Sequence, residues 1–148
     1  MKIAIGSDHA GFELKSEIIK FLEVEGYEVE DLGPTDDKSV DYPIYAKKVA
    51  NYVIDNEHSL GILVCGSGVG VSIVANKIKG IRAVVCSEPL SAKFSRLHNN
   101  ANVLAIGARI VGVEMAKEIV KVWLNEEFLK GRHAERVNMI ADIENIII

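Results

Sequence analysis

The sequence has little of what marks several special classes of protein. It contains only two cysteines in 148 residues, too few for a disulfide framework, so we expect both thiols to be reduced. No apolar run approaches the roughly 20 residues of a membrane span. No sustained basic run is present and the net charge is −4, which argues against nucleic acid as a partner. The first residues enter a strand without the pattern of a signal peptide, so we expect a cytoplasmic protein.

What is present is the composition of an ordinary globular domain. The hydrophobic share is 49% and the charged share 26%, which leaves no case for disorder. A chain of this length is large enough to bury roughly 70% of its unfolded surface in one core. We therefore expect a single domain over residues 1–148 that does not enter a membrane.

Apolar strands alternate with helical patterns along the whole chain. The expected strands are 2–6, 27–32, 60–65, 81–86 and 103–106. The expected helices are 12–25, one opening at Asp41-Tyr42-Pro43, one after Gly70, then 89–98, 113–125 and about 134–145. The last residues, Ile146-Ile147-Ile148, either pack at a subunit contact or fray.

This alternation predicts a Rossmann-like three-layer α/β/α fold with a five-stranded parallel sheet and an extra C-terminal helix. Right-handed crossovers leave few topologies, and the common doubly wound order for five strands is 2-1-3-4-5. Its switch point lies between the first and third strands. Ligands in such sheets bind beyond the carboxyl ends of the strands at that point.

The most informative stretch is the glycine loop that follows the third strand. Gly66, Gly68 and Gly70 alternate after the apolar run Ile62-Leu63-Val64, and a helix can begin directly afterwards. Several backbone N–H groups can then point at one spot, which binds an anion or stabilises an oxyanion. Cys65, the last strand residue, lies against these donors, and a helix N-terminus favours a thiolate.

Other interpretations of this loop fit less well. It lacks the Lys-Ser/Thr of a Walker loop, and Val71 stands where a dinucleotide fingerprint needs its third glycine and a cysteine phosphatase its arginine. Glu88 could mimic the acid that binds a ribose, so nucleotide binding stays an alternative. Cys65 could also be a small buried hydrophobe. Cys86 ends a strand without a glycine loop, which favours a structural role.

Further candidate residues lie on other segments. Asp8-His9 follows the first strand, where ligand contact is favoured over a helix cap and a solvated histidine. Arg109 follows the fifth strand at the same edge. His98 closes a helix, and either helix-dipole stabilisation or acid catalysis would explain it. Arg132 and Arg136, four residues apart, either clamp a phosphate or form a solvated face.

Together these parts are a thiol base, an oxyanion-stabilising loop, a histidine acid and several arginines. This set suits proton abstraction next to a carbonyl in a phosphorylated substrate. An aldose–ketose isomerase needs each part and requires no metal or other cofactor. The sequence therefore favours a sugar-phosphate isomerase, and a flavodoxin-like module for a nucleotide or flavin is the alternative from another class.

The chain resembles the type B ribose-5-phosphate isomerases and the related allose- and galactose-phosphate isomerases. The motifs that carry the resemblance span nearly the whole chain. They are Gly6-Ser7-Asp8-His9-Ala10-Gly11, Asp41-Tyr42-Pro43, Cys65-Gly66-Ser67-Gly68-Val69-Gly70, Ala75-Asn76-Lys77, Gly80-Ile81-Arg82-Ala83, Cys86-Ser87-Glu88-Pro89, Arg96-Leu97-His98-Asn99, Gly107-Ala108-Arg109 and Gly131-Arg132-His133.

The resemblance implies a role for each candidate. Cys65 would move the proton between C1 and C2, His98 would open the furanose ring, and Ser67 would be the third catalytic residue. Some members use a glutamate at the position of Val71 instead of the cysteine, and some have threonine in place of Ser67. The residues implied to bind the substrate are Asp8, His9, Gly66, Ser67, Gly68, Val69, Gly70, Asn99, Arg109, Arg132 and Arg136.

The resemblance also implies an assembly and a reaction. Members of the family form homodimers whose active sites take residues from both subunits, often paired into tetramers. The implied reaction interconverts ribose 5-phosphate and ribulose 5-phosphate without a cofactor. An isomerase of six-carbon aldose 6-phosphates would use the same residues and stays an alternative.

Overall fold

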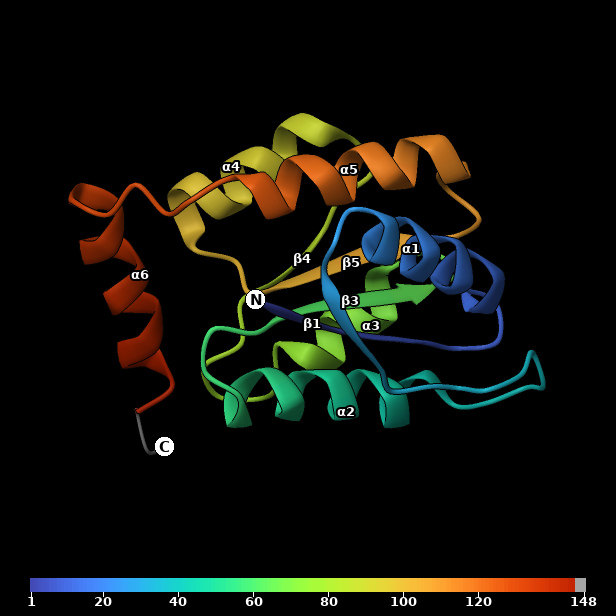
Figure 1. The fold of residues 1–148 in the computed structure, drawn as a ribbon. Helices are drawn as coiled ribbons and strands as arrows, with labels where there is room; N and C mark the ends of the chain where they lie inside the picture. The colour runs from blue at the N-terminus through green and yellow to red at the C-terminus, as the bar shows by residue number, and fades with distance from the viewer. Residues whose placement is uncertain (146–148) are drawn as a thin grey trace.

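Figure 1 shows a computed structural model in which helices cover both faces of a parallel sheet. The structure describes residues 1–145, so the three terminal isoleucines and the two interpretations of them lie outside the described residues. The strands are β1 (Lys2–Ser7), β2 (Glu28–Asp31), β3 (Leu60–Cys65), β4 (Ala83–Val85) and β5 (Val103–Gly107). The helices are α1 (Phe12–Val24), α2 (Tyr42–Asp55), α3 (Val69–Ala75), α4 (Pro89–Asn99), α5 (Val113–Asn125) and α6 (Arg132–Ile143).

Each expected element is present, and several of their ends differ from the expected ones by one or two residues; β4 and α6 differ most. β4 covers only Ala83–Val85 instead of the expected 81–86. The side chain of Asn76 bonds both backbone groups of Ala83, at 2.8 and 2.9 Å, and so fixes the start of this short strand. α6 begins at Arg132 instead of residue 134, which places Arg132 and Arg136 one turn apart within the same helix.

The expected strand order 2-1-3-4-5 is wrong, because the sheet has the order β2-β1-β3-β5-β4. β5 lies between β3 and β4, pairing Val64 with Ile106 on one side and Val84 with Leu104 on the other. Every residue of β5 is buried, whereas β4 is short and partly exposed. The interior position goes to the strand that is apolar on both faces, and the shorter strand takes the edge.

Right-handed crossovers explain how the helices are distributed in this order. The connections β1–α1–β2 and β4–α4–β5 both run toward the β2 edge, so α1 and α4 cover one face together with α5. The connections through α2 and α3 run the other way and cover the opposite face. Figure 1 shows these two helical layers on either side of the sheet. The predicted switch point between β1 and β3 is unaffected.

The hydrophobic core has two parts, one on each face of the sheet. The larger part, under α1, α4 and α5, includes the fully buried side chains of Trp123, Ile18 and Ile106. The part under α2 and α3 consists of smaller residues, such as Ala46, Ala50 and Val49. The small side chains let α2 pack closely against β1 and β3, next to the glycine loop.

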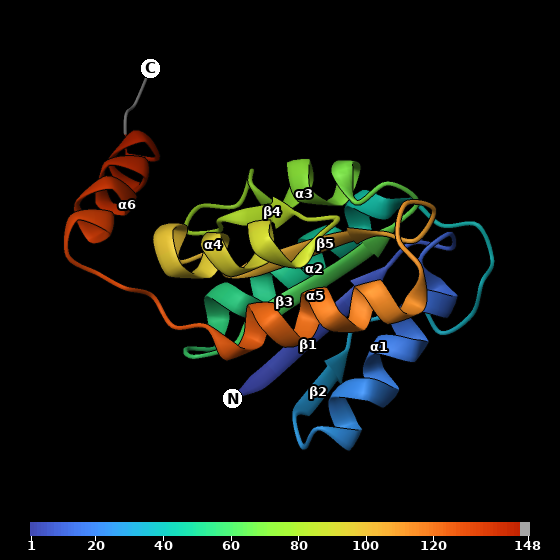
Figure 2. The same cartoon turned by 90° about the horizontal axis from the view of Figure 1, so that it is seen from above.

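α6 lies outside the two helical layers, beside the C-terminal end of α4 and after an extended segment (Figures 1 and 2). Its one buried residue is Val137. Met139 and Ile143 are 66% and 67% exposed, which is unusual for large apolar side chains near the end of a chain that is otherwise well packed. A single subunit therefore leaves much of the apolar surface of this helix uncovered.

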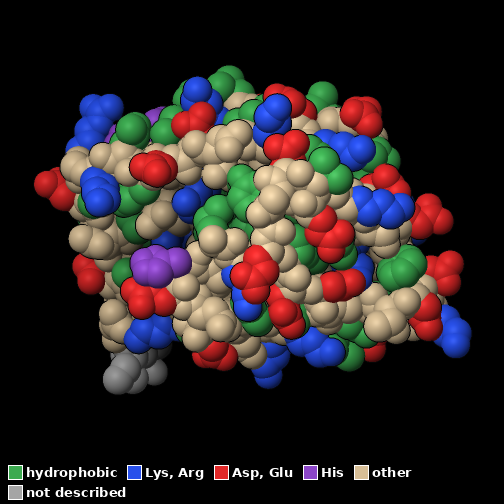
Figure 3. Space-filling model, in the orientation of Figure 1, with side chains coloured by type: hydrophobic (Ala, Val, Ile, Leu, Met, Phe, Trp, Pro, Cys, Tyr) green, Lys and Arg blue, Asp and Glu red, His purple; other side chains and the backbone are tan. Residues whose placement is uncertain are grey.

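The surface carries charges of both signs. On the face shown in Figure 3, Lys and Arg side chains are interspersed with Asp and Glu instead of forming one basic patch. Within residues 1–145 no helix is both long and apolar enough to cross a membrane.

Candidate functional site

The glycine loop curls around the sulfur of Cys65. The thiol ends β3 and is buried, and the Gly68 backbone N–H donates to its Sγ at 3.1 Å. Gly68 has φ +78°, a left-handed conformation that favours glycine and lets the chain turn from the strand into α3. The Ser67 Oγ accepts a hydrogen bond from the Val69 N–H at 3.2 Å and so caps the first turn. An N–H directed at the sulfur stabilises negative charge there.

Cys65 lies in a pocket of about 410 Å³. The residues that line it are Asp8, Tyr42, Cys65, Gly66, Ser67, Gly70, Arg109 and Ile110. The Val69 N–H is taken by Ser67 Oγ, but the next N–H groups of α3, those of Gly70 and Val71, have no helical acceptor at this end of the sheet. Thiol, carboxylate, hydroxyl and guanidinium groups therefore share one cavity with a set of backbone donors.

The sheet brings the three segments of this pocket together. β3 pairs with β1 on one side and β5 on the other, so Ser7, Val64 and Cys65 end at the same edge as Gly107. The Arg109 N–H donates to the Gly66 carbonyl at 2.9 Å. A Cβ atom on Gly66 would lie 3.3 Å from the Arg109 guanidinium, which therefore lies directly over the loop.

The loop after β1 holds its two candidate residues in different ways. Asp8 is 9% exposed and accepts the Gly11 N–H through Oδ1 at 3.0 Å, which leaves Oδ2 for the pocket. His9 lies beyond the pocket wall, and its Nδ1 accepts the Val40 N–H at 3.2 Å. In the neutral ring the proton is then on Nε2, so His9 presents a donor to any ligand at this edge.

The other four candidates lie at the opposite end of the sheet. α4 runs antiparallel to the strands, so His98 and Asn99 at its C-terminus lie where β4 and β5 begin. The Arg82 Nε donates to the Asn99 carbonyl at 3.0 Å, which fixes this position. Figure 1 shows α6, with Arg132 and Arg136, at the same end, far from the carboxyl ends of the strands. One chain therefore does not bring these residues to Cys65.

Cys86 and Glu88 have structural surroundings. Burial, with the negative charge of Glu88 second, raises the pKa of the Cys86 thiol to about 11. The Glu88 carboxylate accepts the Ser91 N–H at 2.9 Å and caps α4, and hydrogen bonding to Ser91, through its side chain first and its backbone second, lowers the Glu88 pKa. Glu88, the residue on which the nucleotide-binding alternative rested, therefore serves as a helix cap. His98 lies in the last turn of the same helix, as its structural interpretation requires.

Two residues that line the pocket, Tyr42 and Ile110, were not predicted as site residues from the sequence. Tyr42 begins α2, and its ring lies 2.9 Å from where a Cβ on Gly70 would be. The signal for it was the Asp41-Tyr42-Pro43 helix start, because α2 crosses from the β2 edge to β3. Ile110 had no signal beyond following Arg109. Among residues 1–145, no group of three His, Cys, Asp or Glu side chains is arranged to hold a metal ion.

Comparisons with known proteins identify the family of this chain. The model of the Ribose/Galactose Isomerase family matches residues 3–140. Ribose-5-phosphate isomerase B of Escherichia coli (strain K12) is 55% identical over 143 residues, which cover 97% of this chain and 96% of that protein.

Two solved structures are similar over nearly their whole length. Ribose-5-phosphate isomerase B of Clostridium thermocellum superposes with a TM-score of 0.96 and 53% identity, covering 98% of each chain. The enzyme of Mycoplasma genitalium, solved with bound ribulose-5-phosphate, has a TM-score of 0.94 and 40% identity, covering 99% of this chain and 97% of that one. With the family model matching residues 3–140 and these relatives covering nearly the whole chain, the chain belongs to the ribose/galactose isomerase family.

Proposed function

We propose that this protein interconverts D-ribose 5-phosphate and D-ribulose 5-phosphate in the cytoplasm, with no cofactor. The observation that carries the proposal is the pocket in which the Cys65 thiol faces a glycine loop, Asp8 and Arg109. A relative with the same fold was solved with bound ribulose-5-phosphate, which supports this substrate over a six-carbon sugar.

In the proposed mechanism Cys65 acts as the base. Its thiolate takes the proton from C2 of the open-chain aldose, the electron pair of that C–H bond forms the C1–C2 double bond, and the electron pair of the C1 carbonyl moves onto O1 to give an enediolate. A proton passes from O2 to O1, the electron pair on O2 forms the C2 carbonyl, and the electron pair of the C1–C2 double bond takes the proton back from the thiol at C1, which gives the ketose. Backbone N–H groups of the glycine loop stabilise the negative charge on the oxygen, and the Gly68 N–H holds the sulfur in place at 3.1 Å.

The remaining pocket residues bind and orient the sugar phosphate. The free oxygen of Asp8 accepts a sugar hydroxyl, while Nε2–H of His9 and the Arg109 guanidinium donate to the substrate. The Ser67 hydroxyl keeps the loop in shape through Val69 and assists at the reacting carbons. The backbone of Gly66 through Gly70 closes around the same atoms.

The site is completed by a second copy of the chain. An exposed apolar band surrounds the β4 edge, and it comprises Ile73, Val85, Leu90 and Phe94, each more than 40% exposed. Val85 borders the glycine loop, because a Cβ on Gly68 would lie 2.8 Å from its Cγ2. A second copy that covers this band in a homodimer would sit beside Cys65.

Symmetry then gives the distant residues their role. His98 and Asn99 of the partner subunit reach the sugar ring, and Arg132 and Arg136 of the partner subunit clamp the phosphate. The two guanidinium groups are one turn apart and exposed, as a phosphate clamp requires. His98 donates the proton that opens the furanose ring. Pairing of dimers into a tetramer is compatible with this site and is not needed for it.

The proposal is tested by ribose 5-phosphate turnover in the presence of a chelator, with allose 6-phosphate assayed alongside. Wild-type protein is expected to be active, and Cys65→Ala to lose about a thousandfold or more in kcat with little change in KM. The matched control Cys86→Ala should keep activity within a few-fold. Retained turnover in Cys65→Ala would refute the base, and turnover of allose 6-phosphate alone would refute the five-carbon substrate.

A further inference from the structure

Three rings are stacked where α6 meets α4. Phe94 and His98, four residues apart on α4, have ring centroids 5.0 Å apart and planes inclined by 11°. His133 from α6 lies over His98, with centroids 4.5 Å apart and planes inclined by 9°. Both faces of the His98 ring are therefore covered, and only its edges, which carry the two nitrogens, are free to meet a ligand.

The sequence of α6 explains why His133 points at α4. His133, Val137, Ile140 and Glu144 recur at spacings of four, three and four, so they form one stripe along the helix. Val137 is buried, and the Glu144 carboxylate accepts the Gly80 N–H at 3.0 Å. The stripe holds α6 against the body of the subunit at several points, and His133 is its contact nearest the start of the helix.

We propose that His133 is a positioning residue: its ring, stacked on His98, fixes the orientation in which His98 opens the sugar ring. The inference rests on the proposed function, since it assumes that His98 performs this step. An imidazole at the end of a helix can rotate about two side-chain bonds, and a flat ring on each face removes most of that freedom. The nitrogen that carries the proton is then held in one direction before the substrate arrives.

The charges around His133 fit this role. Burial lowers the pKa of His133, and the positive charges of His98, Arg132 and Arg136 lower it further. A lowered pKa favours the uncharged form of the His133 ring, which disfavours a further positive charge beside Arg132 and Arg136. Because Arg132 and His133 are neighbours on α6, the same contact also keeps the arginine pair beside the ring-opening acid.

The experiment separates ring opening from isomerisation. In a Cys65→Ala background no proton moves between C1 and C2, but ring opening and closing still exchange the two furanose anomers of ribose 5-phosphate. This exchange is measurable by NMR at pH 7.5. Cys65→Ala protein is expected to accelerate the exchange, and the added change His98→Asn to remove the acceleration.

Three further variants in that background test His133. His133→Ala should slow the exchange about tenfold to a hundredfold, as misplaced catalytic groups do. His133→Phe, which keeps a flat ring in the stack, should restore most of the rate. The matched control Val137→Ala loosens the same stripe but leaves the stacked rings of Phe94, His98 and His133 unchanged in type, and it should leave the exchange rate within about twofold.

The outcomes distinguish the inference from the proposed function. If His98→Asn removes the acceleration but His133→Ala leaves it intact, the positioning role is wrong and the proposed function stands. If Val137→Ala slows the exchange as much as His133→Ala, docking of α6 and not the stacked ring is responsible, and the positioning role is again wrong. If Cys65→Ala protein does not accelerate the exchange at all, the ring-opening role of His98 fails and the inference fails with it.

Discussion

At the scale of single residues, the two cysteines show how surroundings decide the chemistry of one side chain. Cys65 ends β3, Cys86 directly follows β4, and both are buried. Cys65 lies at the wall of a pocket with an N–H directed at its sulfur. Cys86 belongs to the core beneath α4, where burial raises its pKa to about 11. Both thiols thus pack in the core, but only Cys65 also borders the pocket and receives an N–H at its sulfur, which is why Cys65 and not Cys86 is the proposed base.

Alkylation should tell the two thiols apart. With iodoacetamide at pH 8, the folded protein is expected to be modified at Cys65 first, because at a pKa of about 11 only about one Cys86 in a thousand is a thiolate. Peptide mapping by mass spectrometry over time measures both rates, and denatured protein, in which both thiols react, is the control. Equal rates in the folded protein would contradict the assignment.

The raised pKa of Cys86 also makes the free energy of unfolding depend on pH. The folded state favours the neutral thiol, so its contribution is fully present below the unfolded pKa of about 8.5 and is lost as the pH rises toward 11. Cys86 therefore contributes nothing to loss of stability in acid.

Single residues close to the glycine loop could be predicted from the sequence. Cys65 ends an apolar strand, Asp8 and Arg109 follow one within two residues, and the carboxyl ends of parallel strands meet at one edge. Tyr42 was missed because a residue at a helix start does not signal by its type which cavity it faces. Such a contact depends on how closely α2 packs, here against Gly70.

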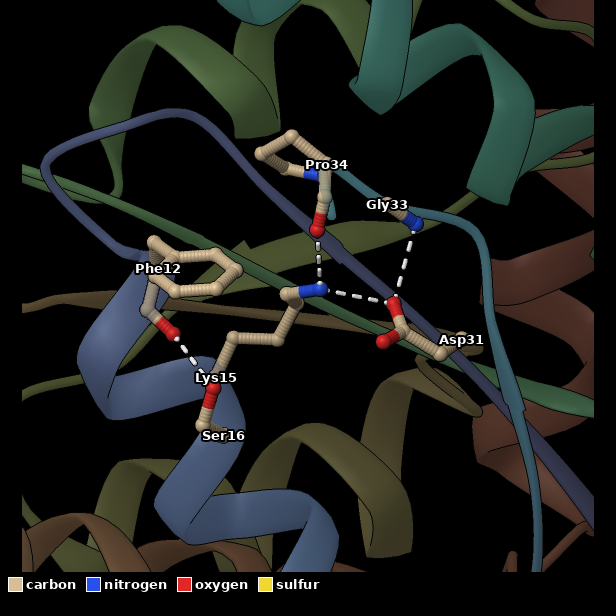
Figure 4. A network of polar contacts seen from close by, with 6 residues as sticks. All are labelled: Phe12, Lys15, Ser16, Asp31, Gly33 and Pro34. Atoms are coloured by element: carbon tan, nitrogen blue, oxygen red, sulfur yellow. Dashed lines mark hydrogen bonds and ion pairs between the residues drawn. The ribbon is translucent and has the colours of Figure 1, made fainter. Parts of the chain in front are cut away.

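At the scale of elements, a buried lysine joins α1 to the loop after β2 (Figure 4). The Lys15 side chain is 1% exposed, and its Nζ lies 2.7 Å from Asp31 Oδ1 and 2.8 Å from the Pro34 carbonyl. Asp31 also accepts the Gly33 N–H at 2.9 Å. This network fixes the start of the loop that leads to Val40, the residue that bonds His9.

The two partners of this ion pair should not be equally costly to remove. Asp31 is 46% exposed, so Lys15→Met leaves a carboxylate that water can solvate, at a cost of about 1 kcal/mol in the free energy of unfolding. Asp31→Ala leaves a buried ammonium with one carbonyl partner and should cost about 3 kcal/mol.

Chemical denaturation of the two variants measures this difference. The exposed pair Lys20→Met and Glu17→Ala serves as control and should change little, since both side chains are at least 41% exposed. A larger loss for Lys15→Met than for Asp31→Ala would show that the buried ammonium is not the costly group.

The order of the strands is where element-level prediction failed. Periodicity identifies that 81–86 and 103–106 are apolar strands, but two apolar strands of similar length give no sign of which lies at the edge. Two facts decide the order. β5 pairs with both β3 and β4, and β4 is short because the Asn76 side chain bonds the backbone of Ala83 and fixes where the strand begins. The wrong strand order did not change the predicted position of the site, because β1 and β3 are neighbours in either order.

At the scale of the whole molecule, the proposed composite site can be tested by mixing inactive subunits. Cys65→Ala and His98→Asn homodimers are both expected to be nearly inactive with ribose 5-phosphate. A hybrid dimer has one site with both defects and one site with neither. Random exchange of subunits should therefore restore about a quarter of the wild-type activity.

The control for this mixture is a pair of variants with defects in the same half-site. Cys65→Ala mixed with Asp8→Ala should restore nothing, because in the hybrid each site still takes one defective residue from its own glycine-loop edge. If the first mixture also stays inactive under conditions in which the subunits exchange, the shared site is wrong.

A single sequence gives the order of residues along one chain, so it does not by itself predict which residues of two subunits meet in one site. The i, i+4 spacing of Arg132 and Arg136 and their helix are confirmed. Their distance from Cys65 in the same chain depends on the extended segment before α6, which carries no periodic signal. Only the resemblance to a dimeric family offered an expectation that bridges the two ends of the sheet.

The place of β5 inside the sheet has a consequence for the time course of synthesis. Among residues 1–145, β4 has β5 as its neighbour, so it emerges from the ribosome before the strand that must hold it. The roughly 20 residues between them take about 1–4 s to translate. During that interval the outer edge of β3 is open and β4 has no ladder to join. The second half of the sheet therefore forms in one step, when the fifth strand arrives.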